Sequence, residues 1–108
     1  MSYHRHYLPR FEKDIKKYAG LRERIYKQVK RISDDPYTNT ERLGHPADAL
    51  NLKGCRSAHV GMNFRILFVV CEECRNEPEC EYCYCEGLSD QTVVFLTVGP
   101  HDKAYTMQ

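Results

Sequence analysis

Apolar residues in the first third of the chain recur at the spacing of amphipathic helices. A stretch of aromatic and apolar residues at Tyr3–Leu8 first predicts a strand. Further apolar positions then follow at intervals of three and four, which places each group on one helical face. The two groups are Phe11, Ile15 and Tyr18, and then Leu21, Ile25, Val29 and Ile32. Pro9 suits the first turn of the first helix, Gly20 suits its end, and Pro36 follows the second helix. The pattern predicts a strand followed by a helical hairpin.

The second half of the chain is patterned as strands. We expect a strand at Cys55–Val60, while Phe64–Val70 and Thr92–Val98 are nearly continuous apolar runs, typical of strands buried on both faces. Polar, turn-forming residues predict a loop at residues 36–48 and a short polar tail at Gly99–Gln108. The element order predicts a single α+β domain of 108 residues. In it, the N-terminal strand and the helical hairpin pack on a small, mostly antiparallel, twisted sheet.

Charge is divided unevenly along the chain. The formal net charge is only +1, but residues 1–70 hold 14 Lys/Arg against 7 Asp/Glu, a balance of +7. Residues 71–108 hold 2 against 8, a balance of −6. A basic body suits binding to a phosphate backbone. The helix lysines are more simply explained as solvated surface charges: Lys16, Lys17, Lys27 and Lys30.

The sequence carries no sign of membrane targeting. No apolar run approaches the roughly 20 residues that span a bilayer. The opening MSYHRHYLPRF lacks the apolar stretch of a secretory signal. We therefore expect a cytoplasmic protein without a membrane partner.

Five of the six cysteines lie close together in the segment CEECRNEPECEYCYC. Cys71-x2-Cys74 and Cys80-x2-Cys83 are two pairs whose thiolates can face one tetrahedral zinc ion. Cys85 competes with the second pair for a place in the ligand set. One or two disulfides are the alternative, although they are rare in cytoplasmic proteins, and an iron–sulfur cluster is the third interpretation. The spacing predicts a zinc site.

The position of the cysteines indicates that this metal is structural. They belong to a Cys-rich hairpin insert at residues 71–90, between two buried strands that a tight turn could have joined. An all-cysteine shell leaves zinc no open position for water, so the ion would stabilise the fold and take no part in catalysis. Cys55 lies outside the insert and is expected to be an ordinary buried thiol.

Residues suited to RNA cleavage gather in three parts of the chain. Cleavage through the RNA's own 2′-hydroxyl needs a base, an acid and positive charge for the phosphate, which histidine and arginine supply near neutral pH. The candidates are His45 in the loop, Arg56, His59, Asn63 and Arg65 along the strand pair, and His101 and Tyr105 after the last strand. Arg65 stands out within an apolar strand, because a buried guanidinium needs a partner or a cavity. The alternative interpretation is that His45 is an exposed loop residue without a role and that His59 is a structural residue of its strand.

Two runs, LKGCRSAHVGMNFRILFVV and TVVFLTVGPHDKAY, resemble the C-terminal half of the RelE superfamily of toxins. The run RFEKDIKKYAGLRERIYKQVKRISDDP is similar to the helical hairpin of that family. The resemblance covers nearly the whole chain apart from residues 71–90. Within the superfamily the chain is most similar to the YafQ branch, in which three features recur. Here they are His45-Pro46, His59, and Gly99-Pro100-His101 with Tyr105.

The resemblance implies the toxin of a type II toxin–antitoxin system. Such a toxin is an endoribonuclease, an mRNA interferase, which in most relatives cuts mRNA on the ribosome and is blocked by a cognate antitoxin. It implies an acid role for His101, proton transfer or RNA positioning by His59 and His45, and phosphate stabilisation by Arg65. On this basis we expect Tyr105 to stack on a base or orient the nucleotide. We expect Arg56 and Lys53 to steer the RNA backbone, with Asn63 as a further RNA contact. The chemistry would need no metal. Asn63 stands where YafQ has an aspartate and Ala58 where RelE has a lysine, so the base remains open between the histidines.

Two other functions are compatible with the same resemblance. ParE-type relatives share the scaffold but poison DNA gyrase, a role for which the three histidines His45, His59 and His101 would not be needed. A second alternative is a catalytically silent binding module whose zinc hairpin mediates a protein contact.

Overall fold

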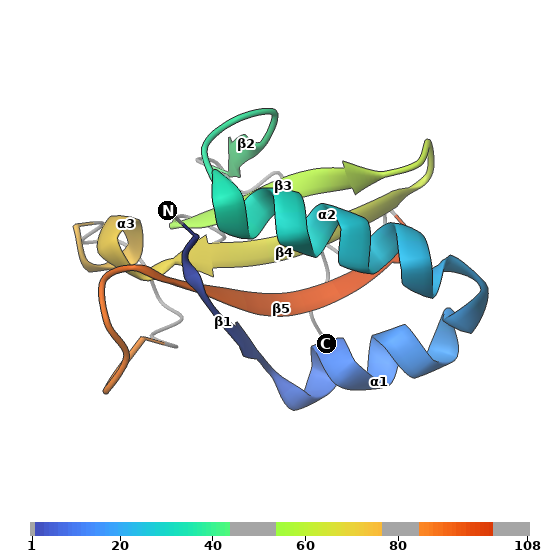
Figure 1. Cartoon of the computed structure of the whole chain (residues 1–108), viewed down its shortest axis with the longest axis horizontal. Helices are drawn as coiled ribbons and strands as arrows, with labels where there is room; N and C mark the ends of the chain where they lie inside the picture. The colour runs from blue at the N-terminus through green and yellow to red at the C-terminus, as the bar shows by residue number, and fades with distance from the viewer. Residues whose placement is uncertain (1, 44–53, 77–84, 101–108) are drawn as a thin grey trace.

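The computed structural model describes residues 2–43, 54–76 and 85–100 of the chain, which Figure 1 shows as coloured ribbon. In chain order the elements are β1 (His4–Tyr7), α1 (Pro9–Lys17), the 3-10 turn η1 (Ala19–Leu21), α2 (Arg22–Asp34), β2 (Glu41–Leu43), β3 (Cys55–Val60), β4 (Phe64–Val70), α3 (Cys71–Arg75) and β5 (Thr92–Pro100). The strands form one five-stranded sheet in the order β1-β5-β4-β3-β2. β1 runs parallel to β5, and the other neighbours are antiparallel. The predicted α+β fold is confirmed.

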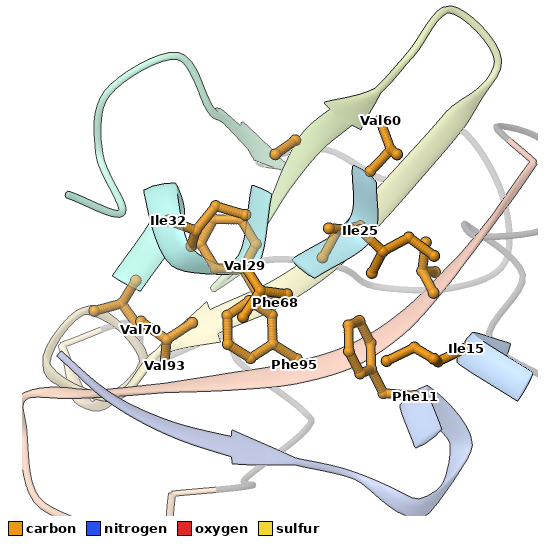
Figure 2. Packing of buried hydrophobic residues seen from close by; sticks show 13 residues of the cluster. Phe11, Ile15, Ile25, Val29, Ile32, Val60, Phe68, Val70, Val93 and Phe95 are labelled. Carbon is orange, nitrogen blue, oxygen red and sulfur yellow. The ribbon is translucent and has the colours of Figure 1, made fainter. Parts of the chain in front are cut away.

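The helical hairpin covers one face of the sheet, with α1 beside β5 and α2 over β3 (Figure 1). The apolar stripes of both helices enter a single core, which Figure 2 shows from close by. Its members are Phe11, Ile15, Ile25, Val29, Ile32, Ala58, Val60, Ile66, Phe68, Val70, Val93, Phe95 and Val98. This core holds the hairpin to the sheet because both elements bury their apolar sides in it.

A second apolar cluster lies on the opposite face of the sheet. Successive strand residues point to opposite faces, so β4 and β5 contribute Leu67, Val69, Val94 and Leu96 to this side. Cys55, Cys71, Cys74 and Cys85 complete the cluster, and all four are buried. The residues that cover this face therefore come partly from the cysteine-rich insert.

The β4–β5 ladder contains a register shift between Leu67 and Phe68. Leu67 pairs with Thr97, whereas Phe68 pairs with Phe95. The extra residue on β5 is a bulge, which changes the face to which the following residues point. Val98 consequently joins the core on the helix side.

Most predicted elements are confirmed to within a few residues, and β3 and β4 have the predicted bounds. The loop expected at residues 36–48 is wrong in part, because Glu41–Leu43 pair with β3 as an edge strand. Three residues are too few to show a periodic pattern in the sequence. These residues become a strand because they pair with the edge of β3 that β4 does not occupy. The tail expected from Gly99 is also wrong at its start, since Gly99 and Pro100 continue β5 opposite Arg65 and Phe64.

The start of the expected hairpin insert is a short helix, α3, which follows β4 without a break. No helix among the described residues is long and apolar enough to cross a membrane.

Replacing Phe68 by Ala should lower the free energy of unfolding by about 3–5 kcal/mol, because it leaves a cavity in the core. Phe68 is fully buried, and its ring centroid lies 6.1 Å from that of Phe95. Urea denaturation followed by circular dichroism measures the change. Met62→Ala is the control, since Met62 is 91% exposed and should change stability by no more than about 0.5 kcal/mol. A similar loss in both variants would contradict the assignment of the core.

Candidate functional site

His59 on β3 and Arg65 on β4 lie directly opposite one another in the sheet. Residues paired in this way point to the same face, and an Nη1 hydrogen of Arg65 is donated to Nδ1 of His59. A guanidinium only donates, so a neutral His59 accepts at Nδ1 and carries its proton on Nε2. The Nε of Arg65 is buried and has no hydrogen-bond partner among the described residues. The guanidinium therefore keeps its Nε in the interior and turns its Nη1 to the imidazole.

The position of Arg65 is fixed by the strands on both sides of it. On β5 its register partner is Gly99, and the preceding Phe64 is opposite Pro100. The Phe64 ring packs edge-on against Tyr18, with 4.9 Å between the ring centroids. The site thus lies where β3 ends, β4 begins and β5 ends.

A basic hollow of about 410 Å³ opens on the other face of β3, the side on which Val60 points toward the helices. It is lined by Arg24, Lys27, Gln28, Arg31, Val60 and Gly61. The Gln28 amide donates to the backbone carbonyl of His59, which connects α2 to the end of β3. The spacing of three and four residues along α2 places these polar side chains on one helical face. That spacing was the signal by which Arg24 and Arg31 could have been found from the sequence.

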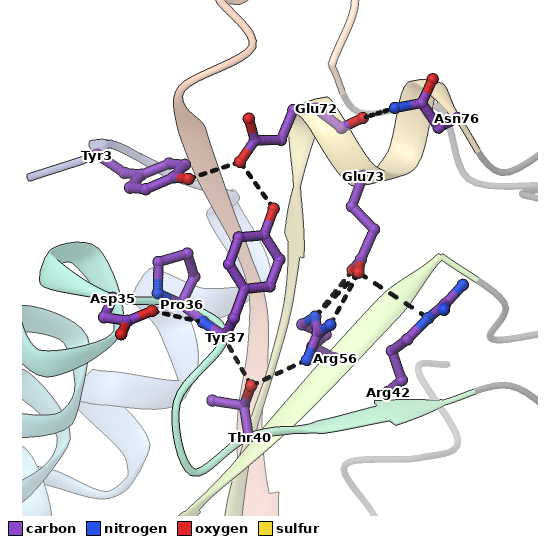
Figure 3. A network of polar contacts seen from close by, with 10 residues as sticks. All are labelled: Tyr3, Asp35, Pro36, Tyr37, Thr40, Arg42, Arg56, Glu72, Glu73 and Asn76. Carbon is purple, nitrogen blue, oxygen red and sulfur yellow. Dashed lines mark hydrogen bonds and ion pairs between the residues drawn. The ribbon is translucent and has the colours of Figure 1, made fainter.

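Arg56, a predicted RNA contact, is engaged with the insert instead. Its Nε donates to Glu73 Oε1 at 2.9 Å and its Nη2 to Glu73 Oε2 at 2.9 Å (Figure 3). Nη1 donates to Thr40 Oγ1 at 3.2 Å, and the guanidinium lies 4.7 Å from the Tyr37 ring centre. The side chains of Arg56 and Glu73 are only 12% and 15% exposed. In this arrangement every nitrogen of Arg56 already has an acceptor, so its charge is not offered to a phosphate.

The neighbouring Glu72 joins α3 to two other parts of the chain. Its Oε1 accepts hydrogen bonds from the hydroxyls of Tyr3 at 2.5 Å and Tyr37 at 2.7 Å. The hydrogen bond to Glu72 raises the pKa of Tyr3. Burial, and then the same carboxylate, raise the pKa of Tyr37. Both phenols remain protonated donors at neutral pH, and α3 is fastened to the start of the chain and to the segment after α2.

Two predicted metal ligands, Cys71 and Cys74, lie with the competing Cys85 in the buried apolar cluster beside α3. The thiol of Cys85 interacts with those of Cys71 and Cys74. Burial raises the pKa of Cys71, and raises that of Cys85 to about 12. Among residues 2–43, 54–76 and 85–100, no three potential ligands already form a metal-binding group. Cys55 is buried, as predicted.

No family model and no curated protein matches the chain by sequence. Solved structures match it in fold over nearly its whole length. The RelBE2 toxin–antitoxin complex of Mycobacterium tuberculosis contains a chain with a TM-score of 0.65 and 18% identity, covering 94% of this chain and 93% of that one. A mutant of the E. coli toxin RelE gives 0.63 and 18% over 99% and 94%, and E. coli YafQ gives 0.61 and 15% over 94% and 96%. The chain has the fold of the RelE-type toxins.

Within this RelE-type fold, the structure brings together some of the predicted residues. His59 and Arg65 are in contact, and Asn63 is exposed in the turn that joins their strands. Arg56 lies elsewhere, in its ion pair with Glu73. The remaining predicted site residues lie outside the described part of the chain: His45, Lys53, Cys80, Cys83, His101 and Tyr105.

Replacing Glu73 by Ala should lower the free energy of unfolding by about 3 kcal/mol, because Arg56 would remain buried without its counter-ion. Urea denaturation measures the loss. Asp90→Ala is the matched control, since Asp90 also pairs with an arginine, Arg75, but its side chain is 68% exposed. That variant should lose no more than about 1 kcal/mol. Equal losses would mean that burial of the Arg56 pair contributes nothing.

Proposed function

We propose that this chain is the toxin of a type II toxin–antitoxin pair and cleaves mRNA as a metal-independent endoribonuclease. The observation that carries the proposal is the contact between Arg65 and His59, which holds a guanidinium and an imidazole together on one face of the sheet. A guanidinium can stabilise a phosphate, and an imidazole can position or transfer a proton near neutral pH. His101 is the next residue of the sequence after β5, whose final residues lie beside Arg65 and Phe64.

The proposed reaction is transfer of the phosphate to the neighbouring 2′-oxygen. The 2′-hydroxyl loses its proton and its oxygen bonds to phosphorus, while the bond from phosphorus to the 5′-oxygen breaks. The leaving 5′-oxygen takes a proton, which we assign to His101. Arg65 stabilises the additional negative charge on the phosphate in the transition state.

The tautomer of His59 favours a positioning role over a basic one. While Arg65 donates to Nδ1, the proton on Nε2 makes His59 a donor to the 2′-oxygen or to the phosphate. His45 is then the candidate base. Tyr105 would stack on a base of the RNA.

We propose the basic hollow on the helix side of β3 as a second contact for the RNA backbone. Arg24, Lys27 and Arg31 line it, and each can neutralise a phosphate. Lys53 and Asn63 are proposed as further RNA contacts. We leave Arg56 out of this set, because Glu73 already occupies it.

The partners we propose are a cognate antitoxin, mRNA and the ribosome. The structural neighbour from Mycobacterium tuberculosis was solved as a toxin–antitoxin complex. A ParE-like action on gyrase is the competing function, and an Agrobacterium tumefaciens neighbour is described as a YoeB/ParE toxin. The Arg65–His59 pair favours RNA cleavage, because it holds together a guanidinium and an imidazole, the two groups that this chemistry uses.

Arg65→Ala and His101→Ala should each slow the cleavage of mRNA on translating ribosomes by about 10²–10³-fold, because each removes a group that acts in the transition state. Mapping of RNA 5′ ends after incubation with the purified chain measures the rate. Growth inhibition on expression should fall in parallel.

Arg5→Ala and His6→Ala are matched controls for arginine and histidine loss. Both residues are exposed on β1, at the opposite edge of the sheet from β2. They should cleave at the rate of the unchanged protein. Undiminished cleavage by a folded Arg65→Ala protein would remove the proposed role of Arg65. Gyrase inhibition without any RNA cleavage would favour the ParE-like alternative.

A further inference from the structure

Three buried cysteines lie in the apolar cluster on the face of the sheet that the helical hairpin leaves open. Cys71 and Cys74 are three residues apart on α3, which places them on one side of that helix. Cys85 comes from the segment that leads into β5. Their exposed fractions are 0%, 6% and 1%. Two separate segments thus bring sulfur atoms to one buried place.

The surroundings of these thiols hold Cys85 against α3. Arg75, at the end of α3, donates to the backbone carbonyls of Cys85, at 2.7 Å, and of Leu88. It also pairs with Asp90, and the Glu72 amide donates to the Asp90 carbonyl at 3.0 Å. These bonds fasten the second segment to the helix independently of the sulfur atoms. They orient the ligand-bearing backbone in the way that outer-shell contacts orient metal ligands.

A purely apolar role does not account for the arrangement of the thiols. A free cysteine packs as a small hydrophobic residue. Cys71, Cys74 and Cys85 of the insert all lie in this apolar cluster, and the thiol of Cys85 interacts with those of both Cys71 and Cys74.

We propose that Cys71, Cys74 and Cys85 are ligands of a structural zinc ion. The ion draws the three thiols around a common point and releases their protons to solvent. An all-sulfur shell is closed to substrate, so the site has no catalytic role. The fourth place belongs to Cys80 or Cys83, which the Cys-x2-Cys spacing of the sequence makes available and which lie outside the described residues.

The ion would stabilise both sides of α3. Its thiols face the apolar cluster of the sheet, while Glu72 and Glu73 of the same helix bind Tyr3, Tyr37 and Arg56. Fixing the helix on one side therefore limits its movement on the other. This inference is independent of the proposed nuclease activity, and Arg65→Ala protein should carry the same amount of zinc.

Protein purified under reducing conditions should contain about one zinc per chain by elemental mass spectrometry. Cys71→Ala, Cys74→Ala and Cys85→Ala should each lose most of it, while Cys55→Ala keeps it. Cys55 is the matched control, because it is a buried thiol of the same apolar cluster. Of Cys80→Ala and Cys83→Ala, the one that loses zinc identifies the fourth ligand.

A measurement on the unaltered protein covers the case in which cysteine variants do not fold. A chelator should lower the thermal unfolding midpoint, and added Zn²⁺, but not Mg²⁺, should restore it. Replacement by Co²⁺ should give the absorption of cobalt bound to thiolates. Absence of zinc with no midpoint shift on Zn²⁺ addition would overturn the proposal. So would retention of zinc by folded Cys85→Ala, equal loss from Cys55→Ala, or a disulfide involving Cys71, Cys74 or Cys85 in the folded protein.

Discussion

The structure depends on a central strand pair that must be covered on both faces. β4 and β5 are almost entirely apolar, and nearly every residue in them is buried. One helical hairpin can cover only one face of such a sheet. The opposite face would expose Leu67, Val69, Val94 and Leu96 to water. The cysteine-rich insert supplies part of the missing cover, which gives it a physical role in the fold whether or not it binds a metal ion.

Because α3 buries one side against the sheet, its other side is placed where it binds nearby tyrosines and Arg56. A five-residue helix placed directly after β4 cannot bury all its sides. Its cysteines face the apolar cluster, and its two glutamates turn toward the tyrosines and Arg56 (Figure 3). A buried guanidinium needs a counter-ion, and Glu73 provides one. The insert therefore changes the use of an arginine that the family resemblance assigned to RNA.

The candidate active site is separate from this region and uses a different part of the sheet. Arg65 breaks the apolar run of β4 near its first residue, between its register partners His59 on β3 and Gly99 on β5. The helix α2 fixes the end of β3 through Gln28, and the basic hollow opens on the other face of this strand. The rigid ladder positions the donors, as a site for a crowded phosphate requires. The insert stabilises one end of the sheet, while the candidate chemistry lies at the other.

The sequence by itself determined the helical hairpin, the three principal strands and the α+β class, because each depends on local periodicity that a core then satisfies. It also singled out Arg65 and His59 and the clustering of thiols. Only the tertiary structure decided that β2 adds to the edge of β3, that Glu73 takes Arg56, and that Cys85 meets Cys71 and Cys74. These contacts join residues distant in the chain through a bulged sheet and a short helix. No local pattern encodes such partners, because the choice among several acidic or thiol groups depends on which of them the folded backbone brings within reach.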